Sequence, residues 1–340
     1  MFNSKPLTRW IVPVYCLIIT LYCLIITFSG HPFSSEDETS DSLKANNKSR
    51  TGLKEIRTGG YHLINPLLDC YELNPARMRN MKQAESKIKD FIADAIQDKN
   101  AVTVSVYFRD LSNGPWMGVN EDSSYSPASL LKVPVLLAAL KQAQQDAGYL
   151  SKKVVFNPED VNQFKANIVG EKHILPGNTY TIKELMEHMI IYSDNDAQDL
   201  LTKNISRENY NDVFLELGID LSKYAPMDNF LSVKEYASYF RILFNATYLN
   251  KDMSEQALAL LSYTKYNNGI VAGVPKGTMV SHKFGERFFP GSNIKQLHDC
   301  GIVYKPDKPY LLCIMTRGYD FKQQEKIIST ISEIIYDAIK

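Results

Sequence analysis

The stretch IKQLHDCGIVYKPDKPYLLCIMTR, residues 294–317, decides the fold class of this 340-residue chain. Its two apolar halves are typical of strands, over residues 294–304 and 310–317. Only the turn-forming segment KPDKP, residues 305–309, joins them. So short a connection predicts an antiparallel pair, because parallel neighbours need a crossover of a dozen or more residues.

Cys300 and Cys313 stand in the two strands of this predicted hairpin. Pairing centred on Asp307 would place Cys300 opposite Ile314 and Cys313 opposite Gly301. Because side chains alternate between the faces of a strand, the two sulfurs would then point to opposite faces. We therefore expect no disulfide between them. No pair among the five cysteines has zinc-ligand spacing, so neither a metal nor another cofactor is expected.

The rest of the chain places strands early and late, with helices between them. Further strands are predicted over residues 101–108, 116–119 and 279–284. Amphipathic helices are predicted over residues 75–97 and 321–339, and helical patterns dominate from about 129 to 262. We predict an α+β protein with a five-stranded antiparallel sheet, flanked by N- and C-terminal helices and interrupted by an inserted all-helical region.

The N-terminal segment predicts export. Residues 11–28, IVPVYCLIITLYCLIITF, carry no charge and follow Lys5 and Arg9. As a helix, this segment would span roughly 27 Å, enough for a bilayer core. The positive-inside rule makes residues 1–10 a cytoplasmic tail and places the remainder outside. Either an uncleaved transmembrane anchor or a cleaved signal peptide fits, and the length favours the anchor. We therefore expect the protein to be membrane-anchored and extracytoplasmic, at the cell surface or in the periplasm, or else secreted after cleavage of the signal peptide.

Composition locates the folded part and excludes one class of partner. Residues 29–60 are polar and predict a flexible linker, which leaves residues 61–340 as the folded domain. The chain carries 38 basic and 38 acidic residues, so no charge field attracts a polyanion. We expect a monomer that does not bind nucleic acid.

Ser129 and Lys132 are the first candidate catalytic residues. They lie in SPASLLKVPVLLAAL, residues 126–140, where a turn opens an apolar helix. Positions i and i+3 share a helix face, so the lysine amine would lie beside the serine hydroxyl. A lysine neutralised by desolvation can remove the hydroxyl proton, and a helix N-terminus can stabilise an oxyanion. Pro134 requires that the helix begin close to Ser129 or kink there.

The Ser-x-x-Lys spacing alone is not specific. It recurs at Ser86/Lys89 and at Ser292/Lys295. Only Ser129 opens an apolar helix after a turn, and this context distinguishes it from the other two serines.

Two further motifs follow along the chain. Ser193-Asp194-Asn195 lies between two predicted helices, where helix capping by Ser193 or Asp194 is an alternative explanation. Lys283-Phe284-Gly285 lies on a late strand, where, for this motif alone, a strand lysine before a bulge glycine is a better explanation than function. The joint order of the three motifs is more informative than any one of them.

In this order the motifs resemble those of class A β-lactamases and penicillin-binding serine hydrolases. The segments VAGVPKGTMVSHKFGE (271–286) and LHDCGIVYKPDKPYLLCIMTRG (297–318) are also similar to that family's approach to its third motif and its last two strands. The resemblance covers about residues 61–340. It implies a β-lactamase/transpeptidase-like fold.

The resemblance also implies roles for individual residues. The implied catalytic residues are Ser129 as the acylated nucleophile, Lys132 as its base and Ser193 as a proton relay to the leaving nitrogen. The implied substrate-binding residues are Asn195, Lys283, Phe284, Gly285 and Glu286. Among these, Asn195 would bind a substrate carbonyl and Lys283 a substrate carboxylate. The backbone N–H groups of Ser129 and Glu286 would form the oxyanion hole.

Two departures from the family pattern qualify this expectation. Phe284 stands where the family has Thr or Ser, which removes a hydroxyl donor to the substrate carboxylate, and Arg287 is a candidate replacement. The segment LGIDLSKYAPMDNFLSVKEY, residues 217–236, lacks the family's water-activating Glu-x-x-Leu-Asn. Asp228 is the nearest acid, although it also fits the approach to a helix that begins near Ser232.

The sequence therefore predicts an exported serine hydrolase that acts on β-lactams or D-Ala-D-Ala-type peptidoglycan peptides. Without the water-activating Glu, the acyl-enzyme at Ser129 is expected to deacylate slowly. The alternative is a catalytically impaired module that binds peptidoglycan or a surface partner on the same scaffold. Retention of Ser129, Lys132 and the Ser193 motif favours the enzyme, and a covalent adduct at Ser129 would discriminate the two.

Overall fold

The computed structural model describes residues 61–65, 75–112, 114–162, 168, 170–224, 229–289 and 291–339. The predicted cytoplasmic tail (1–10), anchor or signal peptide (11–28) and linker (29–60) lie outside these residues. Over the part of the chain described, no helix is both long and apolar enough to cross a membrane.

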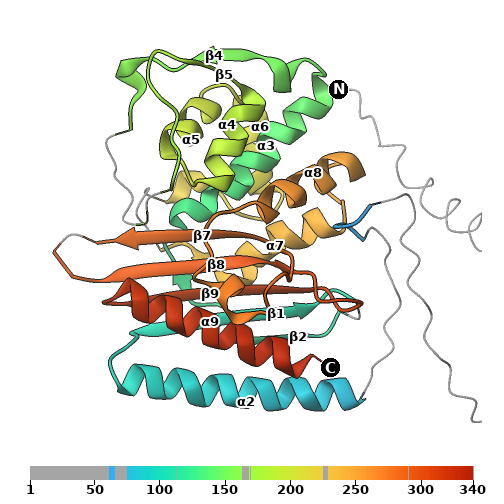
Figure 1. Ribbon diagram of the computed structural model, residues 1–340, viewed down its shortest axis with the longest axis vertical. Coiled ribbons are helices and arrows are strands. Elements are labelled where there is room, and N and C mark those ends of the chain that lie inside the picture. Colours follow the sequence, from blue (N-terminus) through green and yellow to red (C-terminus); the bar gives the residue numbers. More distant parts are fainter. Residues whose placement is uncertain are drawn as a thin grey trace, which may run out of the picture. The chain divides into compact units, whose positions relative to one another are not determined.

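A five-stranded antiparallel sheet lies between two layers of helices (Figure 1). Its strand order is β2-β1-β9-β8-β7. The strands are β1 (Thr103–Asp110), β2 (Trp116–Val119), β7 (Val280–Phe288), β8 (Lys295–Val303) and β9 (Tyr310–Gly318). The predicted hairpin is β8 and β9, and it places the last three strands side by side.

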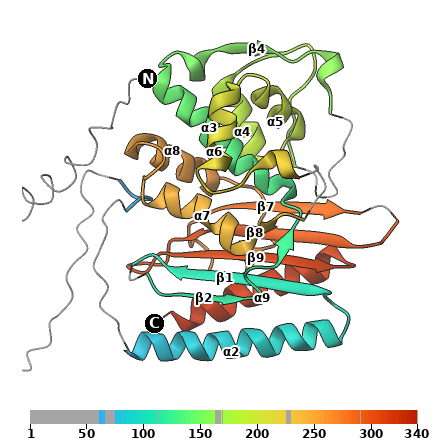
Figure 2. The same cartoon turned by 180° about the vertical axis from the view of Figure 1, so that it is seen from behind.

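Two long helices cover one face of the sheet, α2 (Pro75–Gln97) and α9 (Phe321–Ala338). The opposite face carries the inserted helical region (Figure 2). Its helices are α3 (Lys132–Gln145), α4 (Ile182–Ile191), α5 (Asn195–Thr202), α6 (Arg207–Leu215), α7 (Val233–Phe244) and α8 (Lys251–Ser262). The predicted α+β architecture is confirmed, with a helical insertion between the early and late strands.

Short elements complete the insertion. Two small antiparallel pairs form, β3 (Ser124–Tyr125) with β6 (Leu231–Ser232) and β4 (Lys153–Val155) with β5 (Thr179–Thr181). The 3₁₀ turns are η2 (Ala128–Leu131), η3 (Tyr149–Ser151), η4 (Pro158–Asp160), η5 (Leu221–Lys223) and η6 (Ile270–Gly273). The helix predicted near Ser232 is α7, which Ser232 caps together with Glu235 in a reciprocal capping box.

The sheet is buried on both faces, which explains the nearly continuous apolar sequence of β9. Leu311, Cys313 and Met315 pack into the core beneath the helical region. Leu312 and Ile314 point the opposite way, into the core beneath α2 and α9. Both cores must form before β9 is shielded from water, so the sheet depends on both helical layers.

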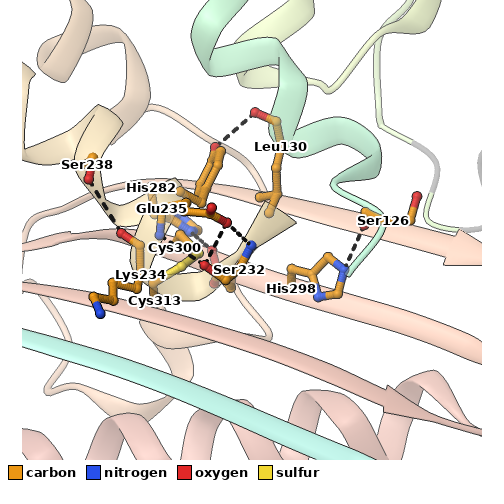
Figure 3. Close-up of a disulfide and its surroundings, with 12 residues drawn as sticks. Ser126, Leu130, Ser232, Lys234, Glu235, Ser238, His282, His298, Cys300 and Cys313 are labelled. Carbon is orange, nitrogen blue, oxygen red and sulfur yellow. Dashed lines mark hydrogen bonds and ion pairs between the residues drawn. A yellow bond between two sulfur atoms is a disulfide. The ribbon is translucent and has the colours of Figure 1, made fainter. Parts of the chain in front are cut away.

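The expectation of no disulfide in the hairpin is wrong. Cys300 and Cys313 lie directly opposite each other, with Cα atoms 4.0 Å apart, and their sulfurs are bonded (Figure 3). The β8–β9 connection contains six residues, 304–309, so its centre falls between Pro306 and Asp307 rather than on Asp307. That half-residue difference changes every cross-strand partner and brings the two sulfurs to one face.

Removing this disulfide should destabilise the domain. The double variant Cys300→Ala/Cys313→Ala is expected to lose about 2–4 kcal/mol of unfolding free energy, because a covalent constraint on the unfolded chain disappears. Urea denaturation under non-reducing conditions measures the loss. As a control, dithiothreitol should destabilise the wild-type chain but leave the double variant unchanged. Equal urea midpoints for the oxidised wild type and the double variant would show that the bond contributes nothing.

Candidate active site

Ser129 lies on a sharp turn between strand β3 and helix α3. Ala128, just before it, has a φ of 49°, a left-handed conformation that is costly for a residue with a side chain. The turn η2 then leads into α3 at Lys132, so Pro134 is only the third residue of that helix. A proline in the first turn is tolerated because it interrupts no hydrogen bond of the helix interior. The expectation that the helix begins close to Ser129 is confirmed.

Strand β7 packs directly against this turn at Gly285. A Cβ atom at Gly285 would lie 2.9 Å from the Pro127 carbonyl oxygen and 3.0 Å from the Leu130 nitrogen. Any larger side chain would push the strand away from the turn. Gly285 therefore permits close approach of the third motif to the first.

Lys132 joins the first motif to the second. Its side chain is fully buried, and its Nζ lies 2.8 Å from the Ser129 Oγ and 2.7 Å from the Asn195 Oδ1. Burial lowers the pKa of Lys132 to about 8, although the carboxylates of Asp194, Asp199 and Glu286 oppose the shift. A substantial fraction of this amine is therefore neutral near pH 8, and a neutral amine can accept the Ser129 proton.

Lys283 joins the third motif to the second. It is also fully buried, and its Nζ donates to the Ser193 Oγ and to the Phe284 carbonyl oxygen, both at 3.0 Å. Burial, followed by the positive charge of Lys132, holds the pKa of Lys283 well below its ordinary value. Ser193 has a φ of 57°, so its hydroxyl is presented by a strained backbone, whereas at Ser129 the strained residue is the preceding Ala128. The site thus brings two amines and two hydroxyls together.

Asp194 is the structural member of the second motif. One of its oxygens accepts from the N–H groups of Asp196 and Ala197 and caps α5, and the other accepts from Ile174 at 2.8 Å. The capping explanation is therefore confirmed for Asp194. Its anchorage fixes Ser193 and Asn195, which flank it and point toward the two lysines.

Phe284 packs inside the domain beside Lys283. Its ring is 6% exposed, stacks on Tyr266 with centroids 4.2 Å apart, and lies 4.1 Å from the Lys283 Nζ. Among the other predicted binding residues, Glu286 is half-buried and accepts from the Ile168 N–H at 3.4 Å. Arg287 is half-buried in register with Gln296. Asp228, the candidate acid, lies outside the residues described.

Two residues that the sequence reasoning missed anchor the approach to Ser129. The Gln296 Oε1 accepts from the Ser126 N–H at 3.0 Å, and the His298 Nε2 lies 3.1 Å from the Ser126 carbonyl oxygen (Figure 3). Burial lowers the pKa of His298 to about 3, so the ring is neutral and its Nε2–H donates. The polar side chains of Gln296 and His298 at alternate positions of β8 were the available signal, although Lys295 and Asp299 in the same strand weaken it.

His282 pairs with Asp299, whose charge also acts on Lys283. The His282 Nδ1 is 2.8 Å from the Asp299 Oδ1, and both side chains are buried. Side chains alternate along β7, so His282 points away from its neighbour Lys283. Within the described part of the chain, no group of three or more His, Cys, Asp or Glu side chains has the arrangement of a metal site.

Comparison with known proteins identifies sequence relatives over most of the domain. A family model described as "Beta-lactamase enzyme family" matches residues 83–339. "Beta-lactamase 3" of Bacillus cereus is 24% identical over 75% of this chain and 83% of its own length. "Beta-lactamase VEB-1" of Pseudomonas aeruginosa is 24% identical over 72% of this chain and 88% of its own length.

Solved structures share the fold at lower identity. PBP-A, in an acyl-enzyme complex with penicillin G, superposes with a TM-score of 0.63 at 22% identity, over 76% of this chain and 96% of PBP-A. The TLA-1 extended-spectrum β-lactamase gives a TM-score of 0.65 at 19% identity, over 75% of this chain and 99% of its own. At these identities the likeness establishes the fold alone.

The geometry of Lys132 predicts the pH dependence of acylation at Ser129. Because only the neutral amine can accept the proton, the acylation rate with penicillin G should rise through about pH 8 and level off above it. Stopped-flow or quench measurements of adduct formation between pH 6 and 9.5 provide the profile. Lys132→Arg, which cannot lose its charge, should be at least about 100-fold slower throughout. A flat wild-type profile would contradict a basic role for Lys132.

Phe284 should matter for stability. Phe284→Thr is expected to lower the unfolding free energy by about 2–4 kcal/mol, because it leaves a cavity against Tyr266. Phe288→Thr is the matched control, since Phe288 lies on the same strand but is 36% exposed. Urea denaturation should show a large loss only for Phe284→Thr. Equal losses in the two variants would mean that the stacked ring has no special packing role.

Proposed function

Because the chain belongs to the β-lactamase enzyme family, we propose that it is a serine hydrolase that cleaves amide bonds through an acyl-enzyme on Ser129. Its proposed substrates are β-lactams or D-Ala-D-Ala-type peptidoglycan peptides. The observation that carries the proposal is the contact of a buried Lys132 amine with both Ser129 and Asn195, at 2.8 and 2.7 Å.

Acylation in this mechanism begins with proton transfer. The neutral amine of Lys132 takes the Ser129 proton as the Oγ attacks the carbonyl carbon, and a tetrahedral oxyanion forms. The backbone N–H groups of Ser129 and Glu286 are the proposed donors to that oxyanion, supported by the close packing of β7 on the turn at Gly285. Collapse of this intermediate breaks the carbon–nitrogen bond and leaves the acyl group on Ser129.

Ser193 is the proposed donor to the leaving nitrogen. Its hydroxyl accepts a hydrogen bond from Lys283 at 3.0 Å, and as the hydroxyl gives up its own proton, Lys283 can replace it. Lys283 would also attract a substrate carboxylate. Asn195 would bind a substrate carbonyl from the first turn of α5.

We propose that deacylation is slow. Residues 217–236 lack Glu-x-x-Leu-Asn, and the acids whose charges act on Lys132 have other contacts. Asp194 accepts three backbone N–H groups, Asp199 accepts from the Asn162 side chain, and Glu286 accepts from Ile168. A carboxylate engaged in this way is a weaker base toward water, which supports an acyl-enzyme that accumulates.

We further propose that the domain acts as a monomer outside the cytoplasm, anchored by residues 11–28 or secreted after their removal. The uncharged segment after Lys5 and Arg9 supports export. The disulfide between Cys300 and Cys313 also supports it, because such bonds persist in oxidising compartments.

A catalytically impaired binding module is the second candidate. Phe284, which replaces a hydroxyl residue of the family pattern with a buried ring, is the observation that favours it. The hydrogen-bonded set of Ser129, Lys132, Ser193 and Lys283 favours the enzyme, since a binding module would not need two buried amines on two hydroxyls.

Intact-mass measurement after addition of penicillin G tests the proposal. The purified chain should gain the mass of one penicillin molecule. The adduct should persist for many minutes, because residues 217–236 lack Glu-x-x-Leu-Asn and the described acids that act on Lys132 are engaged in other hydrogen bonds. Ser129→Ala should take up none. Ser86→Ala is the matched control, since Ser86 shares the Ser-x-x-Lys spacing but lies exposed on α2, and it should react as the wild type does.

Two other results of the mass measurement would contradict parts of the proposal. A transient adduct with accumulating hydrolysed penicillin would refute slow deacylation but retain the hydrolase. Failure of penicillins, cephalosporins and a D-Ala-D-Ala peptide ester to modify Ser129 would favour the binding module.

A further inference from the structure

Tyr236 reaches from α7 to the turn that carries Ser129. Its side chain is fully buried, and its hydroxyl donates to the Leu130 carbonyl oxygen at 2.9 Å. Leu130 directly follows Ser129 and lies two residues before Lys132. In Figure 3 the dashed line at the labelled Leu130, in the turn η2, marks this hydrogen bond. The contact therefore joins two segments that are 106 residues apart, at the backbone between the two candidate catalytic side chains.

The sequence explains why this carbonyl can accept from a donor outside the helix. In an α-helix the carbonyl of residue i accepts from the N–H of residue i+4. For Leu130 that residue is Pro134, which has no N–H. The Lys132 N–H is shared between the Leu130 and Ser129 carbonyl oxygens, so the Leu130 carbonyl can still accept a second, undivided hydrogen bond. The Tyr236 hydroxyl donates that bond.

We propose that Tyr236 is a positioning residue for acylation, which holds the 3₁₀ turn so that the Ser129 hydroxyl stays against the Lys132 amine. The inference rests on the proposed function, since acylation at Ser129 is the step it affects. Tyr236 acts through the Leu130 backbone.

The other end of the turn is already fixed, which makes the Leu130 contact decisive for its shape. Gln296 and His298 bind the backbone of Ser126 on the entry side. Between the two anchors lies Ala128, held in a left-handed conformation. A strained segment keeps its conformation only where the surroundings over-determine it. Loss of the Tyr236 hydrogen bond would let the exit side of the turn relax.

The hydroxyl is suited to a permanent donor role. Burial, together with neighbouring Tyr239 and the charge of Asp299, raises the pKa of Tyr236 well above its ordinary value. It therefore remains protonated at every pH at which the domain would act. The Tyr236 hydroxyl can therefore act as a hydrogen-bond donor to the Leu130 carbonyl throughout that pH range.

The test begins with Tyr236→Phe, which removes the hydroxyl and leaves the ring. With penicillin G, the first-order acylation rate constant should fall about 10-fold, because small misplacement of reacting groups is expensive in rate. The dissociation constant of the non-covalent complex should change less than about 2-fold, because Tyr236 is fully buried and contacts the Leu130 backbone rather than the substrate. A role in folding alone would not produce this split between rate and binding.

Tyr239→Phe is the matched control. Tyr239 lies one turn further along α7 and is equally buried, and its hydroxyl has no hydrogen-bond partner among the residues described. Tyr239→Phe should acylate at the wild-type rate. Equal rate losses in the two variants would overturn the inference.

A second variant restores the missing donor. Pro134→Ala returns an N–H to position 134, from which an α-helical bond to the Leu130 carbonyl can form. In the Tyr236→Phe background it should recover most of the lost rate. A double variant that is no faster than Tyr236→Phe would contradict the role assigned to that carbonyl.

A measurement without any substrate separates this inference from the proposed function. The NMR titration of Lys132 should give a pKa near 8 in the wild type and a higher value in Tyr236→Phe, because a relaxed turn admits water to the amine. If the wild type takes up no β-lactam, the proposed function fails and this titration still decides the inference. Identical Lys132 pKa values in wild type and Tyr236→Phe would overturn it.

Discussion

The burial of the Lys132 amine is the constraint on which the rest of the site depends. Removing an ammonium group from water is costly, and the cost falls when the group loses its proton. Hydrogen bonds to Ser129 and Asn195 offset part of that cost and also fix the positions of both side chains. A lysine at the helix surface would keep its proton and could not act as a base. Desolvation by the surrounding core therefore makes the proposed role of Lys132 as a base possible.

That buried position requires elements that are distant in the sequence. Strand β7 approaches the Ser129 turn through Gly285, β8 fixes Ser126 through Gln296 and His298, and α7 reaches Leu130 through Tyr236. The sheet holds these elements together, and the disulfide links β8 to β9 beneath the same helical core. A local sequence of four residues thus acquires its geometry from tertiary contacts. Those contacts explain why Ser86-x-x-Lys89, on exposed α2, has the same spacing without the same environment.

The sequence predicted the features that have a period or a fixed order. The short connection between the last two strands predicted their antiparallel pairing, and the order of helices and strands predicted the α+β architecture. The structure also brings the three motifs together, with Lys132 hydrogen-bonded to Ser129 and Lys283 to Ser193. What it missed depends on single-residue geometry. The sequence predicted a five-residue connection, 305–309, centred on Asp307. The connection in the structure has six residues, 304–309, so its centre lies half a residue earlier and Cys300 faces Cys313. The anchoring by Gln296, His298 and Tyr236 crosses between elements, and a pattern within one strand or helix does not identify the partner on another.

The two buried lysines also act on each other. The positive charge of Lys132 lowers the pKa of Lys283, so the proton affinity of Lys283 depends on whether Lys132 is charged. In the proposed mechanism, Lys132 becomes charged when it takes the Ser129 proton. At that moment Lys283 releases its own proton more readily, and its hydrogen bond to Ser193 directs that proton toward the leaving nitrogen. In the proposed mechanism, attack on the carbonyl by Ser129 would therefore favour departure of the leaving nitrogen beside Ser193, through the charge that Lys132 gains.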